Sequence, residues 1–144
     1  MIPNNQKIIN ELVVKSTTDN LATIRKFIRE NTSSSGVDED AISKIILAVD
    51  EACTNIIKHA YKYSPEGEIT IKLQSDNKKI IIKIIDEGKN FNPELIPEPD
   101  LKRLQKEHKG GGLGMFLMKK LMDKVEYSNI SHNRNQVLLV KYLI

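Results

Sequence analysis

Apolar residues recur along the chain with two periods, one typical of helices and one typical of strands. Residues 37–60 keep apolar side chains at i, i+3, i+4 and i+7, the spacing of a helix with one buried face, until Pro65 and Gly67 end the pattern. Residues 16–36 repeat this spacing over a shorter length, between candidate capping residues and a Ser and Gly stop. The chain therefore predicts a short helix and then a long one, with Cys53 on the buried face of the second.

Short runs rich in β-branched residues surround the two helices and predict strands. Residues 7–15 form one such run, and residues 68–88 hold two more, separated by the turn sequence SDNKK. Residues 87–109 carry glycine, prolines and many charges, which predict a long loop, and an apolar helix then runs to about Asp123. Residues 124–144 predict a second hairpin, around the sequence SHNRN.

The resulting order is strand, helix, helix, strand, strand, long loop, helix, strand, strand. Because strands and helices do not alternate, a parallel dinucleotide-binding sheet is disfavoured. We expect an α+β fold in which residues 1–144 form a single domain. Its architecture would be a two-layer sandwich, with a mixed, mostly antiparallel sheet covered on one face by about three helices.

Composition adds few constraints beyond a folded, soluble chain. Apolar residues make up 40% and charged residues 28%, and the net charge of +3 is spread along the sequence. A direct nucleic-acid surface is therefore not expected, since such surfaces need clustered Lys and Arg. One cysteine, no zinc-site spacing, no signal-like start and no membrane-length apolar run favour a cytoplasmic protein without a membrane contact.

Polar residues on the long helix form the first candidate for chemistry. Glu51 and Asn55 lie one turn apart and point away from the apolar face, and His59 continues the stripe. A carboxylate can accept a proton from a nucleophile, and an amide oxygen one turn away can bind a hard cation such as Mg²⁺. The same pair would also suit an ordinary solvated helix face.

The segment IIDEGKNF, residues 84–91, forms the second candidate. Asp86 ends a predicted strand and could accept a hydrogen bond from an exocyclic amine such as that of adenine. Gly88 would let the backbone approach a planar ring closely. Asp and Gly are also the residues that simple turns favour, so a plain turn remains open.

The segment HKGGGLGMFLMKKL, residues 108–121, forms the third candidate. Its glycines stand directly before a helix, where backbone N–H groups and the positive helix end could hold a polyphosphate. Lys109 and His108 could add side-chain donors. A flexible hinge before a helix would explain the same residues, and the spacing fits neither the P-loop nor the dinucleotide-binding glycine motif.

Taken in order, the segments VDEACTNIIKHAY, IIDEGKNF and KGGGLGMFLMKKLMDKV resemble the N, G1 and G2 boxes of the gyrase, chaperone and histidine-kinase type of ATP-binding fold. Within that superfamily the chain is most similar to the bacterial anti-sigma serine protein kinases, and the resemblance covers residues 7–143. One departure is Asn90, which stands where the G1 pattern D-x-G-x-G has its second glycine. Asn tolerates the left-handed backbone better than most residues.

The resemblance implies a role for each matched residue. Glu51 would be the general base, Asn55 would hold the Mg²⁺ that bridges the phosphates of ATP, and His59 would lie beneath the nucleotide. Asp86 would bind the adenine amine, with Gly88 making room for the base. The phosphates would be enclosed by Lys109, Gly110, Gly111, Gly112, Leu113 and Gly114.

The resemblance also implies an activity and partners. The chain would be an ATP-dependent serine protein kinase that phosphorylates an anti-sigma-factor antagonist, binds and inhibits a sigma factor, and forms a homodimer, with residues 87–109 as its ATP lid. Two alternatives remain open. The chain could be a detached histidine-kinase catalytic domain, or a nucleotide-gated protein-binding module in which ATP orders the lid.

Overall fold

The computed structural model describes residues 8–33, 37–89 and 113–143, and its elements follow the order predicted from the sequence. The strands are β1 (Ile8–Lys15), β2 (Glu68–Ser75), β3 (Lys79–Asp86), β4 (Lys124–Ser131) and β5 (Arg134–Tyr142). The helices are α1 (Leu21–Ser33), α2 (Glu39–Asn55) and α4 (Leu113–Leu121), with a 3-10 turn η1 (Thr18–Asn20) and a π-helical turn η2 (Ile56–Ala60).

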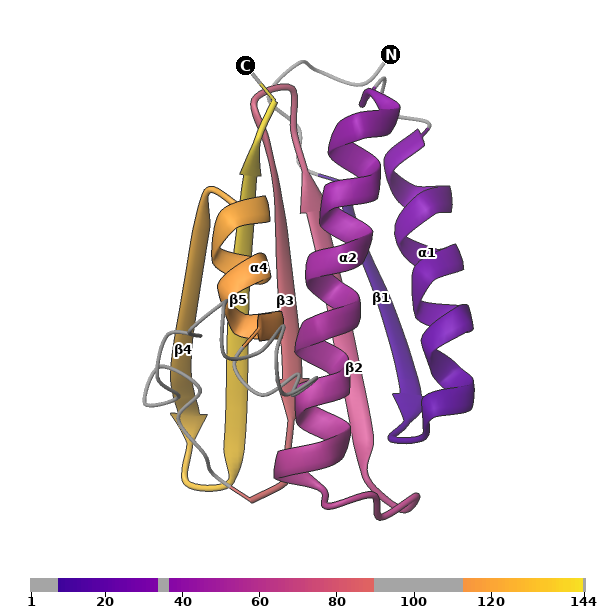
Figure 1. The fold of residues 1–144 in the computed structure, drawn as a ribbon, viewed down its shortest axis with the longest axis vertical. Helices are drawn as coiled ribbons and strands as arrows, with labels where there is room; N and C mark the ends of the chain where they lie inside the picture. Colours follow the sequence, from indigo (N-terminus) through magenta and orange to yellow (C-terminus); the bar gives the residue numbers. More distant parts are fainter. Residues whose placement is uncertain (1–7, 34–36, 90–112, 144) are drawn as a thin grey trace, which may run out of the picture.

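The five strands form a sheet in the order β1-β2-β3-β5-β4, with β3 at its centre (Figure 1). All four described pairings are antiparallel. Alternate side chains of β2 and β3 point to opposite faces, as the two-residue period of a strand requires, and one set is fully buried. That buried set contains Ile69, Ile71, Leu73, Ile80, Ile82 and Ile84.

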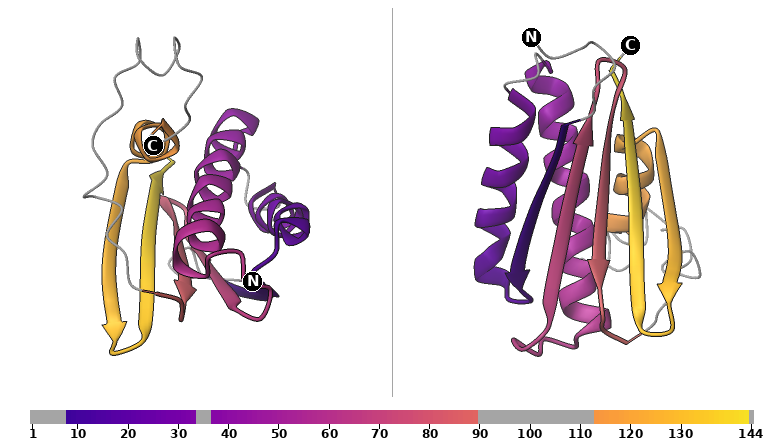
Figure 2. Two further views of the ribbon diagram at one scale, coloured as in Figure 1. Left: turned by 60° about the horizontal axis from the view of Figure 1, so that its bottom comes forward. Right: turned by 180° about the vertical axis from the view of Figure 1, so that it is seen from behind.

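The three helices cover one face of this sheet, so the fold has two layers (Figure 2). α2 lies in the middle and packs against both α1 and α4 (Figure 1). Its predicted apolar stripe is buried, with Ile45 and Cys53 at 0% and Val49 at 1% exposure. Burial also raises the pKa of the Cys53 thiol. The predicted α+β sandwich and the core position of Cys53 are both confirmed.

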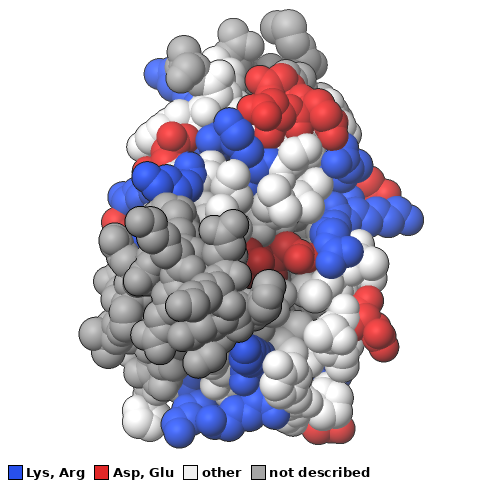
Figure 3. All heavy atoms as spheres, viewed as in Figure 1, with Lys and Arg blue, Asp and Glu red and all other residues white. Residues whose placement is uncertain are grey.

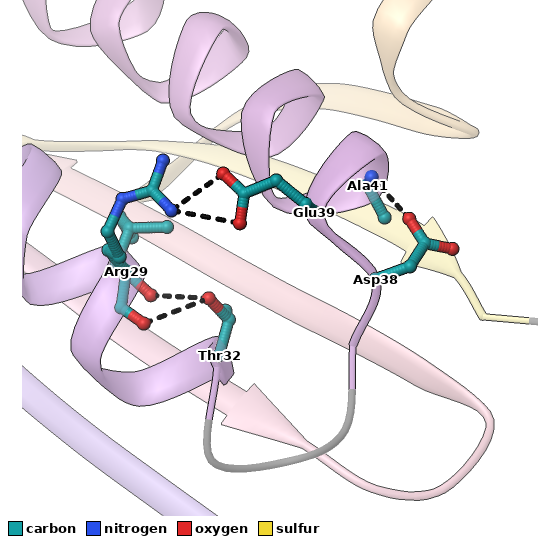
Figure 4. Close-up of polar contacts among 6 residues, drawn as sticks. Arg29, Thr32, Asp38, Glu39 and Ala41 are labelled. Carbon is teal, nitrogen blue, oxygen red and sulfur yellow. Dashed lines mark hydrogen bonds and ion pairs between the residues drawn. The ribbon is translucent and has the colours of Figure 1, made fainter.

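Polar contacts fix the start of α2 beside the end of α1 (Figure 4). The Oδ1 atom of Asp38 accepts a hydrogen bond from the N–H of Ala41 across 2.8 Å, which caps the helix. Arg29 Nη1 donates to both carboxylate oxygens of Glu39, at 2.7 and 3.1 Å. A cap contributes about 1 kcal/mol, whereas an exposed ion pair contributes about 0.2 to 1 kcal/mol. Asp38 is therefore the stronger determinant of where α2 begins.

Candidate functional site

Glu51 and Asn55 lie one turn apart on α2, and both side chains are half-buried. Partial burial raises the pKa of the Glu51 carboxyl, and the charge of the adjacent Asp50 raises it further. A higher pKa makes the ionised carboxylate a stronger base. Asp50 itself is engaged elsewhere, because its Oδ1 lies 2.8 Å from Nε of Arg25 on α1. Glu51 is thus the carboxylate of this turn suited to accepting a proton.

The helix changes form directly after Asn55. In η2 the N–H of Tyr61 donates to the C=O of Ile56 across 3.0 Å, a bond that spans five residues instead of four. Such π-helical turns are frequent at functional sites. The apolar spacing predicts one continuous helix through Ala60, so this widening is a difference between expectation and structure.

His59 is an exposed residue of η2. Partial burial and the nearby charges of Lys58 and Lys62 lower the pKa of its imidazole, which favours the neutral ring at pH 7.

Figure 3 shows acidic side chains gathered where α2 begins, and Lys and Arg side chains near the end of the molecule where α2 finishes. This distribution complements the helix dipole.

Asp86 ends β3 and is only 3% exposed. Its Oδ1 accepts two hydrogen bonds of 3.0 Å, from the N–H of Gly88 and from Nδ2 of Asn135. Burial raises the pKa of the Asp86 carboxyl, and these two donors oppose that rise. Both donors use Oδ1, so Oδ2 is the oxygen able to accept a hydrogen bond from a ligand amine.

Asn135 is a site residue that the sequence reasoning missed. It pairs with Asp86 across the β3–β5 ladder, and its Nδ2 also donates to the C=O of Gly88 across 3.2 Å. It therefore braces both ends of the short turn that begins at Asp86. The pairing depends on strand register, which no local signal in the sequence reveals.

Gly88 lies against the last residue of η2. A Cβ atom at Gly88 would be 2.7 Å from both the carbonyl carbon and the oxygen of Ala60, and the N–H of Lys89 donates to that oxygen across 2.7 Å. The glycine thus allows two backbones to touch, and the expected role of making room for the base stays a prediction. The contact joins the turn after Asp86 to the end of the helix that carries Glu51 and Asn55.

Tyr61 forms a second link between the same segments and was also missed. Its hydroxyl accepts a hydrogen bond from the N–H of Glu87 and donates one to the C=O of Glu68, both across 2.7 Å. Two of the three predicted segments are therefore held together by direct contacts.

The third predicted segment is only partly described. α4 begins at Leu113, so Leu113 and Gly114 form its first turn, and it packs against α2. Figure 1 shows that this first turn faces the end of the molecule at which α2 and β3 both end. Lys109, Gly110, Gly111, Gly112 and Asn90 lie outside the described residues, as does most of the predicted lid. Their roles stay predictions.

A side-chain cluster able to hold a metal and a helix able to span a membrane are both absent from the described residues. In that part of the chain, no three or more His, Cys, Asp and Glu side chains cluster as a metal site would require. Mg²⁺ needs no such cluster when substrate phosphates and water supply most of its ligands. Asn55 fits that need, since its side chain makes no capping bond to η2. Among the described helices, none is long and apolar enough to cross a membrane.

Known proteins resemble the chain over most of its length. Residues 14–141 match the family described as the histidine kinase-like ATPase domain. The chain is 33% identical over 138 residues to the serine-protein kinase RsbW of Bacillus subtilis (strain 168), a match that covers 92% of this chain and 84% of that protein. It is 32% identical over 120 residues to RsbW of Halalkalibacterium halodurans, covering 81% and 73% of the two chains.

A solved structure shares the fold. The crystal structure of the RsbU and RsbW domains of a Mycobacterium tuberculosis protein superposes with a TM-score of 0.67, over 94% of this chain and 32% of that one. The two sequences are 16% identical, so this likeness supports the architecture alone.

Proposed function

The chain belongs to the histidine kinase-like ATPase domain family and is a relative of the RsbW serine-protein kinases, and from this membership we propose how its site works. The chain is a protein serine kinase that transfers the γ-phosphoryl group of ATP to a serine of an anti-sigma-factor antagonist, and it binds and inhibits a sigma factor. One observation carries the assignment of the site: the turn after Asp86 contacts the end of the helix that bears Glu51 and Asn55.

Asp86 is proposed as the residue that selects adenine. The exocyclic amine of adenine is a hydrogen-bond donor, and Oδ2 of Asp86 is an acceptor on a side chain of a residue only 3% exposed, with its orientation fixed through Oδ1. A guanine base would instead present a carbonyl oxygen to this carboxylate, which is repulsive. A site with a fixed buried acceptor rejects a base that lacks the matching donor, because the acceptor would remain without a partner.

Asn55 and Glu51 are proposed to act on the phosphates and the nucleophile. Asn55 would hold Mg²⁺, which neutralises phosphate charge when it is bound. Glu51 would accept the proton of the attacking serine hydroxyl, and its raised pKa supports that task. A serine needs this proton removal, whereas a histidine acceptor is already nucleophilic.

The remaining assignments extend the proposal beyond the described residues. Lys109, Gly110, Gly111 and Gly112 would hold the phosphates together with the N-terminal end of α4, where free N–H groups favour an anion. The sigma factor and the antagonist would be its protein partners. We also propose a cytoplasmic homodimer without direct contact to nucleic acid or membrane.

A phosphotransfer assay with a matched pair of variants tests the proposal. Purified chain is incubated with Mg²⁺, labelled ATP and a serine-bearing antagonist. Glu51→Gln should lower phosphotransfer by about 100-fold or more, within the range of general base catalysis, while ATP affinity stays near that of the wild type. Asp40→Asn is the control and should leave phosphotransfer unchanged, because Asp40 pairs with Lys44 in the first turns of α2, at the other end of the helix from Glu51.

Other outcomes would favour the alternatives. Acid-labile label would indicate phosphohistidine and a detached histidine-kinase domain. Unchanged regulation of the partner by Glu51→Gln would favour a nucleotide-gated binding module. A wild-type chain that binds no ATP would overturn the proposal.

A further inference from the structure

Tyr61 lies where three elements of the site meet. It directly follows η2, and its hydroxyl joins the C=O of Glu68, at the start of β2, to the N–H of Glu87, directly after β3. Ile69 and Asp86 are paired in the β2–β3 ladder, so Glu68 and Glu87 are the next residues beyond it. The hydroxyl therefore closes the end of this ladder at Asp86.

The ring of Tyr61 has little freedom to move. A Cβ atom at Gly67 would lie 2.5 Å from Cδ1 and Cε1 of the ring, so the ring packs directly on the Gly67 backbone. The residue before it, Ala60, is fixed against Gly88 and Lys89. The two residues after it, Lys62 and Tyr63, have φ values of 49° and 65°. Non-glycine residues rarely adopt that backbone, which turns the chain away sharply.

We infer that Tyr61 is a positioning residue for the nucleotide, because its hydroxyl sets the peptide between Asp86 and Glu87 and thereby the direction in which the Asp86 carboxylate faces adenine. This inference rests on the proposed binding of ATP at Asp86. The base contact and the helix that bears Glu51 and Asn55 would then share one fixed spacing, since Tyr61 directly follows the end of that helix.

The alternative is that Tyr61 only stabilises the fold. The two roles differ in what the lost hydroxyl should change. The N–H of Glu87 belongs to the peptide that follows Asp86, and the next N–H, that of Gly88, bonds to Asp86 Oδ1. Without the hydroxyl this peptide is held by fewer bonds, so the Gly88 N–H can shift, and the Asp86 carboxylate bonded to it shifts as well. A positioning role therefore predicts a loss of affinity that is larger for nucleotides with the adenine amine. A fold-stabilising role predicts an equal loss of affinity for every nucleotide.

Tyr61→Phe tests this difference, with Tyr63→Phe as its control. Both variants lose one phenolic oxygen, and Tyr63, two residues further along the chain, is 62% exposed. Affinities for ATP and for inosine triphosphate, which lacks the amine, are measured by calorimetry. We expect Tyr61→Phe to lower the affinity for ATP by about 3- to 10-fold, the range of one lost hydrogen bond. The affinity for the inosine nucleotide should fall less. KM for ATP should rise, with kcat nearly unchanged, and Tyr63→Phe should match the wild type.

Gly67→Ala provides a second, independent test. Its new methyl group would displace the ring while leaving the hydroxyl present. Like Tyr61→Phe, it should lower the preference for ATP over inosine triphosphate. It can replace Tyr61→Phe in the test if that variant fails to fold. Equal weakening of both nucleotides, or unchanged ATP affinity, would overturn the inference while leaving the proposed kinase function intact. Absence of ATP binding by the wild-type chain would overturn both.

Discussion

Replacing Asp86 by asparagine should separate nucleotide binding from folding stability. The amide oxygen can still accept the bonds from Gly88 and Asn135, because it takes the place of Oδ1. An NH₂ group then takes the place of Oδ2 and faces the adenine amine, donor against donor. A hydrogen bond to a charged group contributes about 1.5 to 3 kcal/mol, so ATP affinity should fall by about 10- to 150-fold.

Stability should respond in the opposite sense. Burial raises the pKa of Asp86 in the folded chain above its ordinary value of 3.8, so the protonated form favours folding. That stabilisation is complete below the ordinary pKa and is lost as pH rises through the raised folded value. Asp86→Asn has no proton to lose. The difference in unfolding free energy, variant minus wild type, should therefore become more positive as pH rises from about 3 to 7.

Calorimetric titration with ATP and urea unfolding at several pH values measure the two effects. Asp76→Asn is the control, because Asp76 also accepts backbone bonds, from Lys78 and Lys79 in the β2–β3 turn, at the other end of β3. It should leave ATP affinity unchanged. Normal ATP affinity in Asp86→Asn would refute the assigned base contact, and a large loss of stability at pH 7 would refute the view that this carboxylate is kept for binding.

Two further predictions concern packing. Gly88→Ala should lower the unfolding free energy by about 1 to 3 kcal/mol and weaken the binding of ATP, because the new methyl group meets the backbone of Ala60. Unchanged stability in urea denaturation would contradict this contact. Cys53 is fully buried with a raised pKa, so a thiol reagent should modify it only after unfolding, and rapid reaction of the native chain would contradict its core position.

Much of the fold could be predicted because local periodicity determined it. The apolar stripe of α2 and the alternation in β2 and β3 each report which face is buried, and turn residues such as Asp76 separate them. The pattern also places the candidate residues Glu51, Asn55 and Asp86 on their elements, whereas their proposed roles came from the resemblance to the ATP-binding fold. Each is a polar residue at a definite place in a strongly patterned element.

The parts of the candidate site that could not be predicted from the sequence depend on contacts between elements. Asn135 reaches Asp86 only through the register of β3 and β5, and Tyr61 reaches Glu87 only once η2 has widened the helix. The apolar spacing at Ile56 and Ala60 fits an α-helix equally well, so one extra residue in a turn leaves no trace in the pattern. The close approach of Gly88 to the backbone of Ala60 is likewise a contact between distant elements that the sequence does not show.

The β2–β3 turn has a practical consequence for following this molecule in solution. Asn77 is exposed at its tip, at the opposite end of an eight-residue strand from Asp86, a separation of roughly 26 Å at the usual rise per residue. The natural sequence has a single cysteine, and it is shielded in the interior. A cysteine introduced at Asn77 would thus accept one fluorophore or surface tether, far enough from the proposed nucleotide site at Asp86 to leave that site unobstructed.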